Sequence, residues 1–243
     1  MRSSFVWRDL ITPDSRSVQG FYQSLFGWSF EDHGTCLICR KGDAQIARMN
    51  DKRDSTLPVS WVSHLRVESV EAAFEWALVH GGMPIMSPMD IGDDGYRSAI
   101  IVDPVGALLF LFEGRSVVGA DPCDGHGTVI WNELLTPDLQ LVADFYTSLV
   151  GWEICSRKEY AAFSPHGAPY ATVKGENCSI SQREIPRGIW SLFFAVDDVY
   201  ATIAKAEKLG GKVAVSPANV DKGRVAYIAD PLGAPFGILD HGP

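Results

Sequence analysis

The sequence has few cysteines, few basic residues and no long apolar run. Its five cysteines are an odd number at irregular spacing, which argues against a disulfide framework and favours a reducing, cytoplasmic setting. No apolar run reaches the length of a membrane span, and residues 1–13 hold no apolar signal segment after Arg2, so we expect neither a membrane protein nor a secreted one. Because 21 Lys and Arg stand against 30 Asp and Glu, the net charge is −9, and no nucleic-acid partner is expected.

The composition is that of a folded globular chain. Of the 243 residues, 46% are hydrophobic and 21% are charged, which argues against disorder. Two cysteines, Cys36 and Cys39, form a C-x-x-C sequence within a predicted strand at 35–40. Since residues three apart on a strand point to opposite faces, we interpret them as two separate half-buried thiols rather than metal ligands or a disulfide.

An internal repeat organises the chain. The segment from Trp7 to Trp28 recurs from Trp131 to Trp152 with 12 identities in 22 ungapped positions. The turn sequence Asp-Pro-x-Gly-Ala occurs at 103–107 and again at 230–234. A repeat of about 125 residues is too long for a solenoid unit and indicates two homologous domains. We predict domains at 1–115 and 128–243, with a glycine-rich linker at 116–127 between them.

Each domain contains the element order β-α-β-β-β twice. In the first half, apolar residues at i, i+3, i+4 and i+7 (Val18, Phe21, Tyr22, Leu25) predict a helix that Thr12 or Asp14 caps and Gly27 ends. A second helix at 70–80 is predicted to stop at Gly81-Gly82. Strands are predicted at 5–11, 28–32, 35–40, 44–49, 61–67, 84–87, 96–102 and 107–112.

Three sequence features together carry a family resemblance. They are Thr-Pro-Asp followed by Phe-Tyr-x-x-Leu-Phe-Gly-Trp, an apolar strand with a helix that ends in Gly-Gly, and the Asp-Pro-x-Gly-Ala strand. With these features the chain resembles the glyoxalase / bleomycin-resistance / extradiol-dioxygenase (vicinal oxygen chelate) superfamily, and within it a tandem two-domain glyoxalase-like subgroup. The resemblance implies an α+β fold of four βαβββ modules. Two cupped mixed sheets would each hold a ligand and, in the enzymes, a divalent metal.

The resemblance also places the family's metal ligands on this sequence. In the metalloenzymes they are His, Glu or Gln side chains, mostly on the first and last strands of each module. The corresponding positions are Trp7, Ala47, Val62 and Phe110 in domain 1 and Trp131, Ala171, Ser191 and Gly237 in domain 2. Because indole, phenyl, alanine and glycine side chains supply no ligand atom, we predict no metal at this site. A divalent metal held by a different set around Asp9 and His64 stays open.

Two carboxylates stand at equivalent positions, each two residues after a tryptophan. Strand alternation places Asp9 beside Trp7, and Glu133 has the same spacing from Trp131. Such a pair could bind an amine or hydroxyl ligand, or the carboxylate could act as a general base. The alternative is structural, with ion pairs between Asp9 and Arg97 and between Glu133 and Arg224.

His64 and a group of aromatic residues complete the candidate site. His64 lies in an apolar strand, where a hydrogen-bonded core histidine is the alternative to a functional one. The aromatic residues would line a pocket for a flat or amphipathic molecule, or would fill the cups completely. They are Trp7, Phe110, Phe112, Trp131, Phe193 and Tyr227. Gly237 is expected to leave more room in the second cup than Phe110 leaves in the first.

Three functions are compatible with this sequence. The first is binding of a small organic molecule without the family's metal. The second is an enzyme, a lyase, isomerase or dioxygenase-like catalyst, with a nonstandard metal set or with Glu133, Asp9 or His64 as catalytic group. The third is a scaffold whose cups are plugged by side chains. We expect a small-molecule ligand, a cytoplasmic location and a monomer or homodimer.

Overall fold

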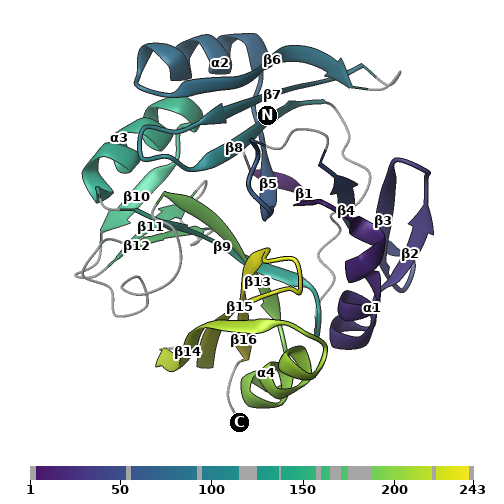
Figure 1. Ribbon diagram of the computed structural model, residues 1–243. Coiled ribbons are helices and arrows are strands. Elements are labelled where there is room, and N and C mark those ends of the chain that lie inside the picture. Colours follow the sequence, from purple (N-terminus) through teal and green to yellow (C-terminus); the bar gives the residue numbers. More distant parts are fainter. Residues whose placement is uncertain are drawn as a thin grey trace. The chain divides into compact units, whose positions relative to one another are not determined.

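The computed structural model of the chain describes residues 4–52, 56–91, 95–114, 125–136, 138–156, 160–164, 171–174, 188–220 and 223–240. The predicted order β-α-β-β-β occurs twice in each half of the chain, which makes four modules (Figure 1). The first two modules comprise β1 (Phe5–Thr12), α1 (Ser15–Phe26), β2 (Ser29–Asp32), β3 (Cys36–Lys41), β4 (Ala44–Asp51), β5 (Ser60–Arg66), α2 (Val70–Val79), β6 (Met83–Ile91), β7 (Tyr96–Val102) and β8 (Leu108–Glu113).

The second half repeats this order. Its elements are β9 (Val129–Leu135), α3 (Leu139–Val150), β10 (Glu153–Ser156), β11 (Tyr160–Ser164), β12 (Ala171–Lys174), β13 (Ile189–Ala195), α4 (Val199–Lys208), β14 (Lys212–Val220), β15 (Gly223–Ala229) and β16 (Pro235–Asp240). Most of the predicted linker, residues 116–124, lies outside the described residues, as do Cys123 and Cys178.

The strands form two mixed, open sheets. Their orders are β2-β3-β4-β1-β5-β8-β7-β6 and β10-β11-β12-β9-β13-β16-β15-β14. Within each module the first strand pairs parallel with the last, as β1 does with β4, and the other neighbours are antiparallel. This confirms the α+β fold with tandem βαβββ modules. Strand β6 is longer than the predicted 84–87 because, at a sheet edge, Pro84 and Pro88 need not donate to a neighbouring strand.

Helix boundaries follow local side-chain chemistry. Asp14 caps α1, since its Oδ1 accepts the backbone N–H groups of Arg16 and Ser17 at 3.1 and 3.2 Å. Gly27 ends the same helix in the left-handed conformation with φ 70°, which a side chain would strain. Asp138 and Gly151 have these two roles in α3. None of the helices in the described part of the chain is long and apolar enough to cross a membrane.

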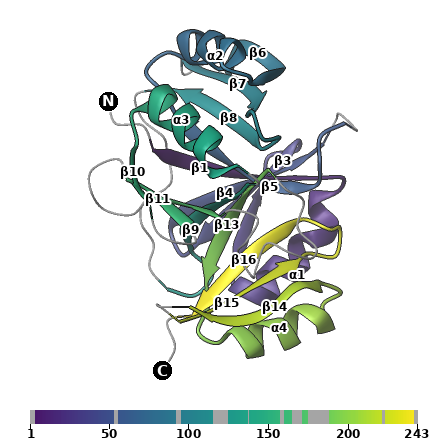
Figure 2. The same cartoon turned by 90° about the vertical axis from the view of Figure 1, so that its left-hand side faces the viewer.

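Contacts divide the chain into two compact units that combine modules from both halves of the repeat. The first unit lies within residues 1–6, 63–117 and 132–190, and the second within 7–62, 118–131 and 191–243. In the first unit α2 packs with α3, and in the second α1 packs with α4 (Figures 1 and 2). The predicted domain boundaries, which follow the sequence repeat, stay a prediction.

A buried hydrogen-bond chain links two modules in the first unit. The indole Nε1 of Trp190 donates to the hydroxyl of Tyr146 at 2.7 Å, and that hydroxyl donates to Asp103 Oδ2 at 2.9 Å. Asp103 Oδ1 also accepts the backbone N–H groups of Val105 and Ala107 at 3.1 and 2.8 Å, which closes the Asp-Pro-x-Gly-Ala turn. Burial raises the pKa of Asp103 to about 6.

The second unit contains the same chain of bonds from the equivalent residues. Trp61 Nε1 donates to the Tyr22 hydroxyl at 2.9 Å, and Tyr22 donates to Asp230 Oδ2 at 3.0 Å. Burial also raises the pKa of Asp230. The repeated Tyr and Asp positions in the sequence therefore hold together modules that are distant along the chain.

The two cysteines of the C-x-x-C sequence lie on opposite faces of β3, as predicted. Cys39 is buried in the core of the second unit, whereas Cys36 is half-buried, and both are free thiols. Burial raises the pKa of the Cys39 thiol well above its usual value.

Candidate ligand-binding site

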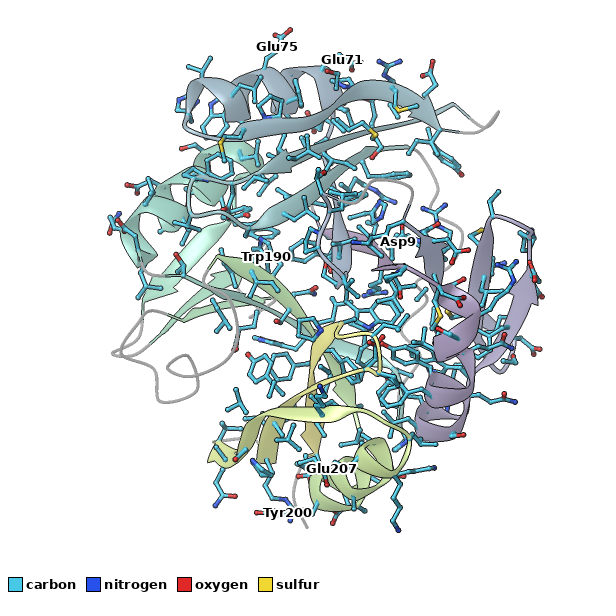
Figure 3. All side chains as sticks on the ribbon, in the orientation of Figure 1. Asp9, Glu71, Glu75, Trp190, Tyr200 and Glu207 are labelled. Atoms are coloured by element: carbon cyan, nitrogen blue, oxygen red, sulfur yellow. The ribbon has the colours of Figure 1, made fainter. Side chains whose placement is uncertain are left out.

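Trp7, Asp9 and Arg48 form a hydrogen-bonded cluster in the second unit. The Arg48 guanidinium donates from Nε to Asp9 Oδ1 at 3.1 Å and from Nη2 to Oδ2 at 2.6 Å. The indole Nε1 of Trp7 donates to the same Oδ1 at 2.8 Å. The expected pairing of Trp7 with Asp9 is therefore present. Figure 3 labels Asp9 on the ribbon of β1.

Strand register brings these residues together. Asp9 on β1 is the parallel partner of Arg48 on β4, and Ile38 on β3 lies opposite Arg48 on its other side. Paired residues share one face of a sheet, so Cys36, two residues before Ile38, also lies there. We call this surface the Arg48 face, defined as Trp7, Asp9, Arg48, Ile38 and Cys36.

The opposite face of the same strands is part of the hydrophobic core. Leu10, Leu37 and Met49 alternate with the residues of the Arg48 face and are buried in the core that includes α1. The Arg48 face is therefore the surface of these strands that the helix does not cover.

The ion pair presents its positive end outward. The Asp9 side chain is 3% exposed, whereas that of Arg48 is 31% exposed. The Asp9 charge raises the pKa of Arg48, so the guanidinium stays protonated. Because a charge buried without a partner is costly, the Arg48 guanidinium offsets the cost of burying the Asp9 carboxylate.

The second half of the repeat keeps the carboxylate but not the arginine. Glu133 on β9 is buried, and its parallel partner on β12 is Thr172, which takes the place of Arg48. Trp131 is half-buried on β9. The repeated Trp-x-carboxylate sequence thus occurs in two different settings.

The expected ion pair between Asp9 and Arg97 is wrong. Arg97 pairs instead with Glu71 on α2 and with Asp90 on β6, the latter at 2.7 Å; Glu71 is labelled in Figure 3. The reason is strand alternation. Arg97 lies opposite Glu113 on β8 and therefore not on the face of Phe110, as the prediction required.

The expected pair between Glu133 and Arg224 is wrong for the same reason. Arg224 lies opposite Asp240 on β16 and binds it at 2.9 Å. Its guanidinium also lies over the ring of Tyr200, at 5.3 Å from the centroid, and 3.6 Å from Asp198. Both arginines therefore connect a sheet to the helix that covers it.

His64 belongs to an aromatic cluster in the first unit. It is buried on β5 and is the parallel partner of Phe110 on β8. The ring centroids of His64 and Phe110 are 4.9 Å apart, and Phe112 lies 6.5 Å from His64. The predicted neighbours are thus together, and the position of the family's last-strand ligand holds a phenyl ring.

Phe193 occupies the space above Gly237 in the second unit. The two residues are parallel partners on β13 and β16, and the Phe193 ring lies where a Cβ on Gly237 would point. Tyr227 packs on Phe193 with centroids 5.1 Å apart. The expectation that Gly237 leaves extra room is therefore wrong, since the ring of its neighbour fills that room.

These positions do not fit a divalent metal. At the last-strand position one half has the phenyl ring of Phe110, and the other has Gly237 covered by Phe193. The Asp9 carboxylate is already bound by Arg48 and Trp7. In the described part of the chain, no three His, Cys, Asp or Glu side chains are grouped in a way that could hold a metal ion.

Replacing Gly237 with alanine is expected to destabilise the protein by about 1–3 kcal/mol, because the new methyl group would overlap the Phe193 ring. A urea unfolding curve measures this loss. Gly20 on α1 is the matched control, since no atom lies within 4 Å of its added Cβ, and Gly20→Ala should stabilise by about 0.5–1 kcal/mol. Equal effects of the two substitutions would contradict the packing of Phe193 over Gly237.

Arg48 is the residue of this cluster that the sequence did not reveal. Its position next to Asp9 depends on the parallel pairing of β1 with β4, which are 39 residues apart at the contact. The sequence offered one indication of its role, which is that Arg48 is a charged residue within the alternating pattern of β4.

Comparisons with known proteins agree with this fold. A family model described as the Glyoxalase/Bleomycin resistance protein/Dioxygenase superfamily matches residues 128–238. CFP32 of Mycobacterium bovis, which is named as a glyoxylase, is 35% identical over 252 residues, covering 98% of this chain and 94% of CFP32. The anthracycline biosynthesis protein DnrV of Streptomyces peucetius is 29% identical over 255 residues, covering 96% and 92%. The Mn(II)-bound glyoxalase of Novosphingobium aromaticivorans superposes with a TM-score of 0.65 at 13% identity, over 99% of this chain and 82% of that one, and this likeness shows the fold alone.

Proposed function

Because the chain belongs to the glyoxalase / bleomycin-resistance / dioxygenase superfamily, we propose that it binds a small organic molecule on the Arg48 face, without the divalent metal of the family's enzymes. The observation that carries this proposal is the Trp7–Asp9–Arg48 cluster. It combines a guanidinium of fixed orientation with an indole on the face of the sheet that α1 does not cover.

The chemistry of the cluster favours binding of an organic ligand. A half-buried indole offers flat apolar surface, and an arginine that is partly exposed offers directed hydrogen-bond donors. Small-molecule sites typically combine apolar walls with a few fixed polar groups. Hydrogen bonds within the chain hold the cluster in place, so its side chains have little freedom to lose on binding.

We propose that no metal is bound because the side chains at these positions offer too few ligand atoms. At the last-strand positions, Phe110 is itself aromatic and Gly237 is covered by the Phe193 ring. The carboxylate of the Arg48 face, Asp9, is bound by Arg48. Elemental analysis of the purified, untagged protein tests this part of the proposal, with no stoichiometric divalent ion expected. About one ion per chain would contradict it.

A second candidate function has one observation in its favour. Glu133 is buried on β9, at the position that Asp9 occupies in the first half of the repeat. A buried carboxylate of this kind can serve as a general base in an enzyme. If so, the protein should catalyse exchange of an acidic C–H proton of a bound ligand in D2O, measured by NMR, and Glu133→Gln should abolish the exchange. Undiminished exchange in that variant would exclude Glu133 as the base.

A further inference from the structure

Resting on the proposed function, we infer that the ligand of the Arg48 face is an organic anion. Its carboxylate, or an equivalent oxyanion, would bind the free edge of the Arg48 guanidinium, and its flat apolar body would lie against Trp7.

The Arg48 guanidinium has N–H donors that Asp9 does not use. Arginine carries five N–H groups, and the two bonds to Asp9 use one on Nε and one on Nη2. The structure gives Arg48 no further hydrogen bond within the residues that it describes. The Nη1 side of the group can therefore donate to a planar, two-oxygen acceptor, which matches a carboxylate.

Asp9 fixes the direction of those donors. Its carboxylate is almost completely buried and grips the guanidinium through two bonds, while Trp7 binds the same carboxylate. The side chain of Arg48 therefore loses little additional freedom when a ligand binds, which favours affinity. The pair as a whole is neutral, but its exposed end is the cationic one.

Recognition would be local rather than long-range. The chain carries a net charge of −9, which repels anions at a distance. The selectivity for an anion must then come from the Arg48 guanidinium itself. It should therefore be lost in Arg48→Gln.

A matched pair of probes tests the inference. Isothermal titration calorimetry compares 2-naphthoate with its neutral analogue 2-naphthamide on the full chain and on Arg48→Gln. We expect naphthoate to bind at least about tenfold more tightly than naphthamide and to lose that advantage in the variant. Arg16→Gln is the control because it removes the same charge in the same unit, at an exposed ion pair with Asp32.

Loss of binding in Arg48→Gln could also result from misfolding, so a second variant and a second measurement are used. In Asp9→Asn/Arg48→Gln both members of this ion pair are neutral, so this variant should fold and still lose the preference for naphthoate. Independently, naphthoate should protect Cys36, which lies on the Arg48 face, from iodoacetamide, as measured on its peptide by mass spectrometry.

The outcomes separate the two proposals. Preference for naphthoate that depends on Arg48, with protection of Cys36, supports both. Equal binding of the two probes, unchanged in Arg48→Gln, overturns the anion class and leaves a small-molecule site. Binding of neither probe up to about 1 mM overturns both the anion class and the proposed function.

Discussion

Arg48→Gln is expected to lower the free energy of unfolding by about 3 kcal/mol, because it removes the guanidinium that pairs with the buried Asp9 carboxylate. The estimate is at the lower end for broken buried pairs, since Arg48 itself is 31% exposed. Urea or guanidinium unfolding at neutral pH measures the change.

The double variant Asp9→Asn/Arg48→Gln should recover most of that loss, because replacing both partners leaves no buried charge. Arg16→Gln, at the exposed pair with Asp32, should change stability by no more than about 1 kcal/mol. If Arg48→Gln has as small an effect as Arg16→Gln, the Asp9–Arg48 pair is not the buried interaction described above.

Asp103→Ala is expected to cost about 3 kcal/mol at neutral pH. The substitution removes the acceptor of three donors, which are the buried Tyr146 hydroxyl, the buried backbone N–H of Ala107 and the part-buried backbone N–H of Val105. Asp103→Asn should cost less, because its side-chain oxygen still accepts hydrogen bonds. Tyr200→Phe is the control for loss of an exposed tyrosine hydroxyl and should stay within about 0.5 kcal/mol.

The same aspartate is expected to make stability depend on pH. Its pKa is about 6 in the folded protein against an ordinary value of 3.8, so the folded state holds the proton more tightly. Stability from this group is therefore greatest in acid, falls by up to about 3 kcal/mol as the pH rises from about 4 to about 6, and is constant above that. Asp103→Asn should remove this part of the dependence, and an unchanged pH profile would contradict the raised pKa.

The repeat and its periodic patterns made the fold predictable. Val18, Phe21, Tyr22 and Leu25 form the buried face of α1 as their spacing predicts, and Gly27 ends the helix. The alternation rule also placed Cys36 and Cys39 on opposite faces of β3. These successes depend on interactions within a few residues of each other, which a sequence displays directly.

The candidate site was only partly predictable, because it depends on register between distant strands. Trp7 and Asp9 are two residues apart on one strand, and their contact followed from alternation. Arg48 is joined to Asp9 by parallel pairing, which no local pattern specifies. For Arg97 the predicted face was wrong, because a hairpin shifted by one residue exchanges the two faces of the strand.

Gly237 illustrates a different limit of sequence analysis. A glycine in a strand indicates space for a neighbour, but the sequence does not say which neighbour uses it. Here the parallel partner Phe193 fills the space with its own ring. His64 and Phe110 occupy the equivalent positions in the first half, so each half places one phenyl ring there.

The most direct test of metal-independent binding at the Arg48 face is calorimetric titration of 2-naphthoate into protein treated with a chelator, repeated after addition of Mn²⁺. We expect the same dissociation constant in both titrations and a loss of at least about tenfold in affinity in Arg48→Gln. Binding that appears only after Mn²⁺ is added, or that is indifferent to Arg48→Gln, would contradict it.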